Sequence, residues 1–154
     1  MESFIPKSLK FEHEELHAEL KKAIQAGGKI GDSAKAVAEI LHPHFMKEEE
    51  FAMPPLGTLS SLAEGKITNE MKNALTMSNR LKAELPEMLN EHKAIVSALK
   101  NLIESATKEK KMEYVRFAEK LMRHAQNEEE VLYPASILVG EYLKLKYIDD
   151  KILV

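Results

Sequence analysis

Apolar residues recur at helical spacing in four stretches of the chain, and no stretch alternates apolar and polar residues as a half-buried strand does. The first stretch predicts a helix over 9–26, with Leu16, Leu20 and Ile24 on one face. The two glycines at 27–28 predict its end, because glycine adopts the left-handed conformation that often terminates a helix.

The second stretch predicts a helix that begins at Asp32 or Ser33, since either side chain can accept hydrogen bonds from the first free N–H groups. This helix should stop before Pro54 and be kinked at Pro43, because proline cannot donate to the helix ladder. A looser segment, 56–70, is expected to follow.

The second half of the chain begins with a predicted helical segment over 69–85, and Pro86 then marks either a boundary or a bend. Two further helices are predicted over 87–106 and 112–133, the last limited by Pro134. The fold class is therefore all-α: an up-down-up-down four-helix bundle with an extra helical segment before the third long helix. The amphipathic tail, residues 141–154, is expected to pack on this bundle.

Two pairs of segments resemble each other in the same order along the chain. "EHEELHAELKKAI" at 12–24 aligns with "EHKAIVSALKNLI" at 91–103, an offset of 79 residues. "HFMKEEEFAMPPL" at 44–56 aligns with "HAQNEEEVLYPAS" at 124–136, an offset of 80 residues. The sequence therefore predicts an internal two-fold repeat of a helix-loop-helix unit.

The 154 residues predict a single domain over 1–154, with repeat halves of about 9–56 and 87–136. The formal charge of −3 gives no electrostatic reason to expect nucleic acid or an anionic membrane as a partner. The chain has no cysteine, which excludes disulfides and thiolate metal sites. Without a signal peptide or a long apolar run, the protein is expected in the cytoplasm.

Polar residues interrupt helix faces that should be apolar. His44 precedes Glu48 by four residues, as His124 precedes Glu128, so both members of each pair can reach one point. The residues predicted to face the interior of the bundle are His13, His17, His44, Glu48, His92, His124 and Glu128. In the repeat His17 corresponds to Val96, which leaves a surface or outer role open for it. By contrast, Glu49, Glu50, Glu129 and Glu130 are expected on solvated faces.

A buried carboxylate without a partner costs several kcal/mol, and an unsatisfied buried imidazole costs roughly 1–3 kcal/mol. Several such penalties would exhaust a typical stability of about 5–15 kcal/mol. A cation removes the penalty, because imidazole nitrogen and carboxylate oxygen are common metal ligands. Seven groups are too many for one ion, so the sequence predicts two.

This order of residues, a histidine, an HxxxE pair, a second histidine and a second HxxxE pair, resembles the hemerythrin-like, or HHE cation-binding, family. The resemblance implies a four-helix bundle that holds two non-haem iron ions joined by an oxo or hydroxo bridge. It implies that His13, His44, His92 and His124 are terminal ligands and that Glu48 and Glu128 are bridges.

Oxygen-carrying members of that family place an HxxxH pair on the third helix, whereas here the pair is His13 and His17, on the first. The resemblance therefore implies, with the halves exchanged, that one iron takes His13, His17 and His44. The other takes His92 and His124 and keeps an open position for dioxygen or nitric oxide.

The leading hypothesis is a non-haem di-iron protein that binds or senses dioxygen or nitric oxide, or handles iron and oxidative or nitrosative stress, rather than an enzyme. Nitrogen and oxygen ligands also suit manganese or zinc. One alternative is a ferritin-like di-iron oxidase, whose ExxH strings would be 14–17 and 39–42. Another is an interaction module with a structural metal site and an unknown protein partner.

Overall fold

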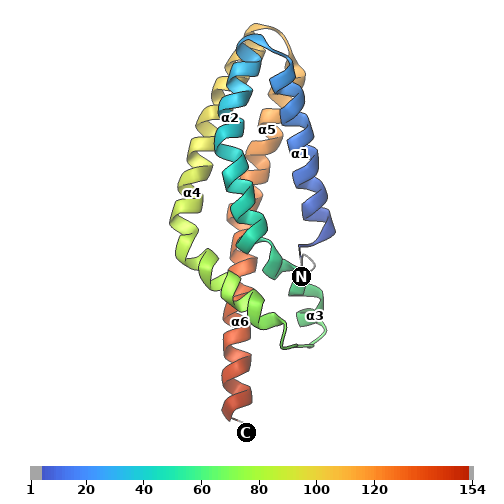
Figure 1. The fold of residues 1–154 in the computed structure, drawn as a ribbon, viewed down its shortest axis with the longest axis vertical. Helices are drawn as coiled ribbons and strands as arrows, with labels where there is room; N and C mark the ends of the chain where they lie inside the picture. The colour runs from blue at the N-terminus through green and yellow to red at the C-terminus, as the bar shows by residue number, and fades with distance from the viewer. Residues whose placement is uncertain (1–4, 153–154) are drawn as a thin grey trace.

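Six α-helices make up most of the computed structural model, which describes residues 5–152 (Figure 1). They are α1 Lys7–Gln25, α2 Gly28–Lys47, α3 Leu59–Ala63, α4 Met71–Lys108, α5 Met112–Asn127 and α6 Tyr133–Ile152. Two π-helical turns, η1 Glu48–Ala52 and η3 Glu128–Leu132, and a 3-10 turn, η2 Pro54–Thr58, connect some of them. Residues 5–152 contain no strand, which confirms the predicted all-α class.

Helices α1, α2, α4 and α5 lie side by side and bury their apolar faces against one another (Figure 1). The predicted faces supply this core, which includes Leu16, Leu20, Val37, Leu41, Ile95, Leu99 and Leu121. Each fully buried leucine or isoleucine stabilises the bundle by roughly 1.5–3 kcal/mol relative to an exposed one. The packed faces fix the four helices on which the predicted histidines lie.

Helix α2 begins earlier than the sequence predicts. It starts at Gly28, directly after Gly27, whose φ of 71° lets the chain reverse within a very short turn. A Cβ atom on Gly31 would lie 2.8 Å from the carbonyl oxygen of Ile24, so the start of α2 fits closely against the end of α1. The predicted start at Asp32 or Ser33 is wrong because a glycine turn, rather than a side-chain cap, begins this helix.

Helix α4 is one helix of 38 residues that continues through Pro86. The segments predicted over 69–85 and 87–106 are therefore two parts of a single bent helix, visible at the edge of the bundle in Figure 1. Proline removes one ladder hydrogen bond and bends a helix without ending it when both flanks are packed. Here Leu81 and Met88, on either side of Pro86, are both buried in one apolar cluster.

The predicted stop at Pro134 is wrong. After α5 the chain continues helically through η3 into α6, which begins at Tyr133. Pro134 is thus in the first turn of α6, where a missing N–H removes no hydrogen bond. The predicted tail packs on α4 as expected, through Leu143 and Tyr147, while residues 153–154 lie outside the described part of the chain. None of the helices within residues 5–152 is long and apolar enough to cross a membrane.

The crossing of α6 over the first half of α4 depends on Gly140. A Cβ atom at this glycine would lie 2.5 Å from the Cβ of Ser78, too close for any side chain. The Ser78 hydroxyl donates a 2.8 Å hydrogen bond to the carbonyl oxygen of Ser136 on α6. The two helices therefore meet almost backbone to backbone at this point.

Replacing Gly140 with alanine should lower the free energy of unfolding by about 1–3 kcal/mol, because the added methyl group overpacks the crossing. Urea unfolding followed by circular dichroism measures this change. Leu138→Ala, on the exposed side of the same helix, should change stability far less. Equal stability of Gly140→Ala and the unmodified chain would show that the helices do not approach this closely.

Candidate metal centre

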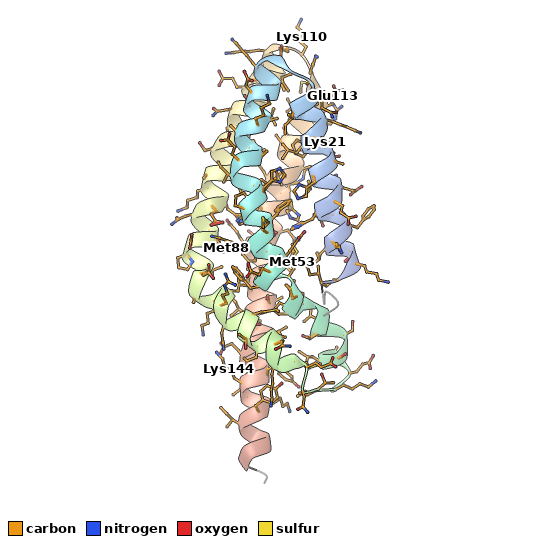
Figure 2. All side chains as sticks on the ribbon, viewed as in Figure 1. Lys21, Met53, Met88, Lys110, Glu113 and Lys144 are labelled. Carbon is orange, nitrogen blue, oxygen red and sulfur yellow. The ribbon has the colours of Figure 1, made fainter. Side chains whose placement is uncertain are left out.

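Four helices each direct one buried histidine to the interior of the bundle. His13 comes from α1, His44 from α2, His92 from α4 and His124 from α5, and none is more than 5% exposed. The two glutamates, Glu48 and Glu128, are the first residues of the π-helical turns η1 and η3 and are at most 1% exposed. The labelled side chains of Met53 and Met88 in Figure 2 are buried near the middle of the molecule.

The first of two potential metal-binding groups, called group A, consists of His44, Glu48, His92 and Glu128. One ligand atom from each of these residues lies within 4.8 Å of the others. His44 Nε2 lies 3.3 Å from Glu48 Oε1, and His92 Nε2 lies 3.3 Å from Glu128 Oε1. Group A thus contains two imidazole nitrogens and two carboxylates around one point.

The second group, called group B, consists of His13, His124 and Glu128. His124 Nε2 lies 3.3 Å and His13 Nε2 lies 3.9 Å from Glu128 Oε2. Glu128 therefore presents Oε1 to a histidine of group A and Oε2 to both histidines of group B. Glu48 also approaches group B, with Oε1 3.9 Å from His13 Nε2.

The structure groups the histidines differently from the division that the resemblance implies. The structure pairs His44 with His92 and His13 with His124, so each group takes one histidine from each half of the chain. Each of these helices packs against two others, α2 against α1 and α4, and α5 against α1 and α4, so histidines from different halves can meet. Sequence spacing shows which residues share a helix face but not which helices become neighbours.

His17 belongs to neither group. It is partly exposed, and its ring stacks on that of His42, with centroids 5.0 Å apart and planes 8° apart. Burial, together with the nearby His42 and His13, lowers the pKa of His17 below its usual value. The structure therefore places His17 in a surface pair with His42 rather than with the central residues.

Carboxylates outside the centre hold the other ring nitrogen of the histidines. The Nδ1 atoms accordingly make three hydrogen bonds, His44 to Glu91 (2.9 Å), His92 to Glu129 (2.9 Å) and His124 to Glu12 (2.5 Å). Because an ionised carboxylate only accepts hydrogen bonds, each Nδ1 is the donor, and the Nε2 lone pair is left facing the centre. Carboxylate–histidine pairs of this kind orient imidazole ligands and make them more basic.

Glu49 and Glu129 are exposed, as expected, but their carboxylates also approach histidines of the centre. Glu129 bonds His92, and Glu49 Oε1 lies 3.6 Å from His13 Nδ1, although both side chains are 40% or more exposed. The signal was present in the repeat, because a glutamate follows Glu48 and Glu128 at equivalent positions. Likewise, Glu12 and Glu91 each directly precede the first-helix histidine of their half.

Tyr133 is a residue of the centre that the sequence analysis missed. Its hydroxyl donates a 2.9 Å hydrogen bond to Glu48 Oε2 and lies 3.2 Å from the Nε2 atoms of both His44 and His92. The side chain is 2% exposed. The repeat gave no signal for it, because the equivalent residue of the first half is Met53.

The two central carboxylates have opposite pKa shifts. Burial raises the pKa of Glu48 well above its usual value, and the charge of Glu128 raises it further. Burial also disfavours the ionised form of Glu128, but the neighbouring Glu48, His124, His13 and His92 favour that form more strongly and lower its pKa well below the usual value. Without a cation, these opposite shifts favour protonation of Glu48 over protonation of Glu128.

Several buried atoms of the centre have no hydrogen-bond partner. Among the described residues these are both ring nitrogens of His13, His124 Nε2, Glu48 Oε1 and Glu128 Oε2, in addition to the Ser136 hydroxyl. Each unsatisfied buried polar group costs roughly 1–3 kcal/mol. A cation bound between the Nε2 atoms and the carboxylate oxygens would satisfy four of them, so the residues present fit a metal site.

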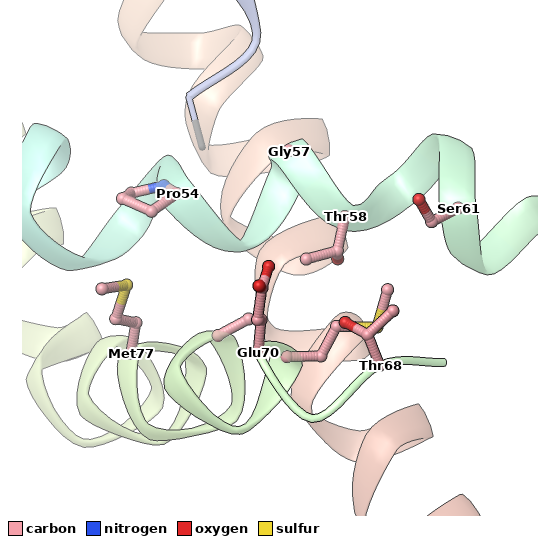
Figure 3. Close-up of a pocket in the computed structure, with 9 residues that line it drawn as sticks. Pro54, Gly57, Thr58, Ser61, Thr68, Glu70 and Met77 are labelled. Atoms are coloured by element: carbon pink, nitrogen blue, oxygen red, sulfur yellow. The ribbon is translucent and has the colours of Figure 1, made fainter. Parts of the chain in front are cut away.

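A separate pocket of about 160 Å³ lies between η2, α3 and the beginning of α4 (Figure 3). Its walls include Pro54, Thr58, Ser61, Glu70 and Met77, and no residue of groups A and B. One carboxylate and no histidine line it, so it offers no metal-binding set.

The family model described as the hemerythrin HHE cation binding domain matches residues 5–136. The chain belongs to this family. Searches of curated proteins and of solved structures give no match. The matched range includes every residue of groups A and B and ends in the first turn of α6. The buried histidines and glutamates of groups A and B thus lie within the range that matches the hemerythrin HHE cation binding domain.

Glu48→Gln tests whether the metal-free HHE domain is destabilised by a buried carboxylate. The pKa of Glu48 is raised in the folded state, so protonated Glu48 favours the folded state. This stabilisation is fully present below the unfolded pKa and is lost as the pH rises through the folded pKa. When a chelator keeps the protein metal-free, the free energy of unfolding of Glu48→Gln should therefore exceed that of the unmodified chain by about 1–3 kcal/mol at about pH 8. At about pH 5 the difference should be much smaller. Urea unfolding at both pH values measures this.

Glu50→Gln is the matched control, because Glu50 is 61% exposed and pairs with Arg80. A metal ion should reverse the order, stabilising the unmodified chain more than Glu48→Gln. A stability difference that is independent of both pH and chelator would contradict this account of Glu48.

Glu91→Gln tests the orientation of His44. Lys47 donates hydrogen bonds to both Glu91 (2.7 Å) and Glu87 (3.1 Å), but only Glu91 also bonds His44. Glu91→Gln should weaken metal affinity about 10–100-fold, because the carboxylate that orients the imidazole is lost. Glu87→Gln, which removes the same charge, should leave affinity almost unchanged, and competition with a chromophoric chelator measures both. Equal losses would assign the effect to Lys47 instead.

Proposed function

We propose that this HHE domain is a dinuclear non-haem iron protein that binds or senses dioxygen or nitric oxide. Glu128 carries the proposal, because its two oxygens face the histidines of two different groups. A carboxylate placed in this way can bridge two cations. Glu48, whose oxygens approach His44 and His13, supplies a second potential bridge.

The donor set supports iron. It contains imidazole and carboxylate only, which suits iron, manganese or zinc and disfavours soft cations that prefer sulfur. Bound iron would supply redox-linked binding of a diatomic, and the residues would hold it in place and exclude water. The proposal includes the duplicated up-down-up-down arrangement, in which two equivalent helix pairs contribute equivalent ligands.

The burial of the centre favours a small ligand. Every histidine and glutamate of groups A and B is at most 5% exposed, and Phe45 covers the His13 ring at a centroid distance of 3.9 Å. A diatomic molecule can reach such a centre through small fluctuations of packing, whereas a larger substrate would need the helices to separate. This argument favours a gas-binding role over an enzyme that acts on an organic substrate.

The ferritin-like alternative is less well supported. Its ExxH strings require His17 and His42 to reach the centre, but His42 is exposed and the two rings stack on each other. That reading also leaves the buried His44, His92 and His124 without a role.

Anaerobic loading with ferrous iron, followed by metal analysis, tests the proposal. We expect two iron ions per chain, and visible spectra that change on exposure to air or nitric oxide. His92→Ala and His124→Ala should each lose bound iron, because each removes a donor from a different group. His17→Ala is the control, because His17 lies on α1 like His13 but belongs to neither group. Binding of only one iron ion by the unmodified chain would contradict the proposal. A loss of iron in His17→Ala equal to that in His92→Ala and His124→Ala would contradict it as well.

A further inference from the structure

The two groups of the centre differ at one position where the repeat would make them alike. In group A, the Tyr133 hydroxyl lies within 3.2 Å of two histidine nitrogens and one carboxylate oxygen. The position equivalent to Tyr133 in the first half of the chain is Met53, which is also buried, at 2% exposure. The residues of group A thus correspond in the repeat to those of group B, but the phenol of Tyr133 corresponds to the thioether of Met53.

The unsatisfied atoms show the same difference independently. The Tyr133 hydroxyl donates its proton to Glu48 Oε2 and lies 3.2 Å from His44 Nε2 and His92 Nε2, all atoms of group A. Three of the buried atoms without a hydrogen-bond partner belong to group B: His13 Nε2, His124 Nε2 and Glu128 Oε2. A fourth, Glu48 Oε1, lies between the groups, 3.3 Å from His44 Nε2 and 3.9 Å from His13 Nε2. Tyr133 thus brings a hydroxyl oxygen to group A, and no residue within 5–152 brings an equivalent oxygen to group B.

The surroundings of the two groups also differ. A surface groove between α4 and α5 reaches His92 of group A and is lined by Ala125 and Glu129. Ala125 corresponds in the repeat to Phe45, whose ring stacks on His13 of group B at 3.9 Å. An aromatic ring therefore covers His13 of group B, whereas a surface groove approaches His92 of group A.

We propose that Tyr133 is a ligand of the iron in group A, and that the diatomic binds instead to the iron in group B. The inference rests on the proposed di-iron function and assigns its two ions different roles. A phenolate oxygen is a hard anionic donor that suits ferric iron better than a thioether does. When ferric iron binds, the iron–oxygen bond replaces the O–H bond of Tyr133, and the proton is released to water.

The first arm of the test examines ferric protein by visible absorption and resonance Raman spectroscopy. Coordination gives a phenolate-to-iron charge-transfer band and enhanced phenolate ring vibrations. Both should be present in the unmodified chain and lost in Tyr133→Phe, with two iron ions retained. Tyr142→Phe is the control, because Tyr142 lies partly exposed on α6 and takes no part in either group.

The second arm counts nitric oxide bound to the ferrous protein by titration and electron paramagnetic resonance. The unmodified chain should bind one molecule per chain and Tyr133→Phe should bind two, because the substitution frees a position in group A. Met53→Tyr places a phenol at the equivalent position near group B. We expect it to reduce nitric oxide binding at least tenfold in affinity and to strengthen the charge-transfer band.

The outcomes separate this inference from the proposed function. Two bound irons without phenolate vibrations in the unmodified chain would overturn the role of Tyr133 and leave the di-iron proposal standing. That measurement needs no variant, so a failure of Tyr133→Phe to fold does not affect it. Absence of a second iron would overturn both proposals together. Equal nitric oxide stoichiometry in the unmodified chain and a folded Tyr133→Phe variant would overturn the assignment of the diatomic to group B.

Discussion

The burial of two carboxylates inside an apolar bundle is the constraint to which the rest of the centre responds. Glu48 and Glu128 are almost completely enclosed, and removing each from water carries a penalty of several kcal/mol. Around them lie four histidines, and outside these lie glutamates that reach the rings from the helix surfaces. From the centre outward, the layers are carboxylates, imidazoles and a second set of carboxylates. This order of groups suits the binding of cations at the centre.

The π-helical turns place these carboxylates. Both glutamates begin such a turn, and the N–H of the residue five positions later, Met53 or Tyr133, bonds the carbonyl oxygen of the glutamate. The wider turn lets the chain direct a glutamate and then a bulky side chain into the interior within one turn. π-Helical turns of this kind often occur at functional sites. They also account for the prolines that follow, because the chain leaves the regular α-helical ladder just before Pro54 and Pro134.

The sequence predicted the parts of the structure that follow from one helix at a time. The all-α class and the inward faces of Leu16, Leu20 and Leu99 were readable because helical periodicity reports burial directly. Six of the seven predicted site residues lie together, and each of the six has a counterpart in the other half of the chain. Their binding of metal stays a prediction. His17, whose counterpart is Val96, is the one that lies elsewhere. The sequence did not predict features that depend on how the helices pack together, such as the pairing of His44 with His92. It also did not predict features that differ between the two halves, such as Tyr133.

The departures from the repeat matter most for function, because a perfectly duplicated centre would give both ions the same surroundings. Two equal ions would compete equally for an added ligand and would be equally exposed to water. Here the second half of the chain supplies Tyr133 to group A and replaces the ring of Phe45 with Ala125, so the group that the groove approaches is the one that already has a phenol. The first half leaves group B without a phenol but covers His13 with an aromatic ring. An ion in a buried site with a free position is suited to reversible binding of an uncharged diatomic, since no protein ligand must leave.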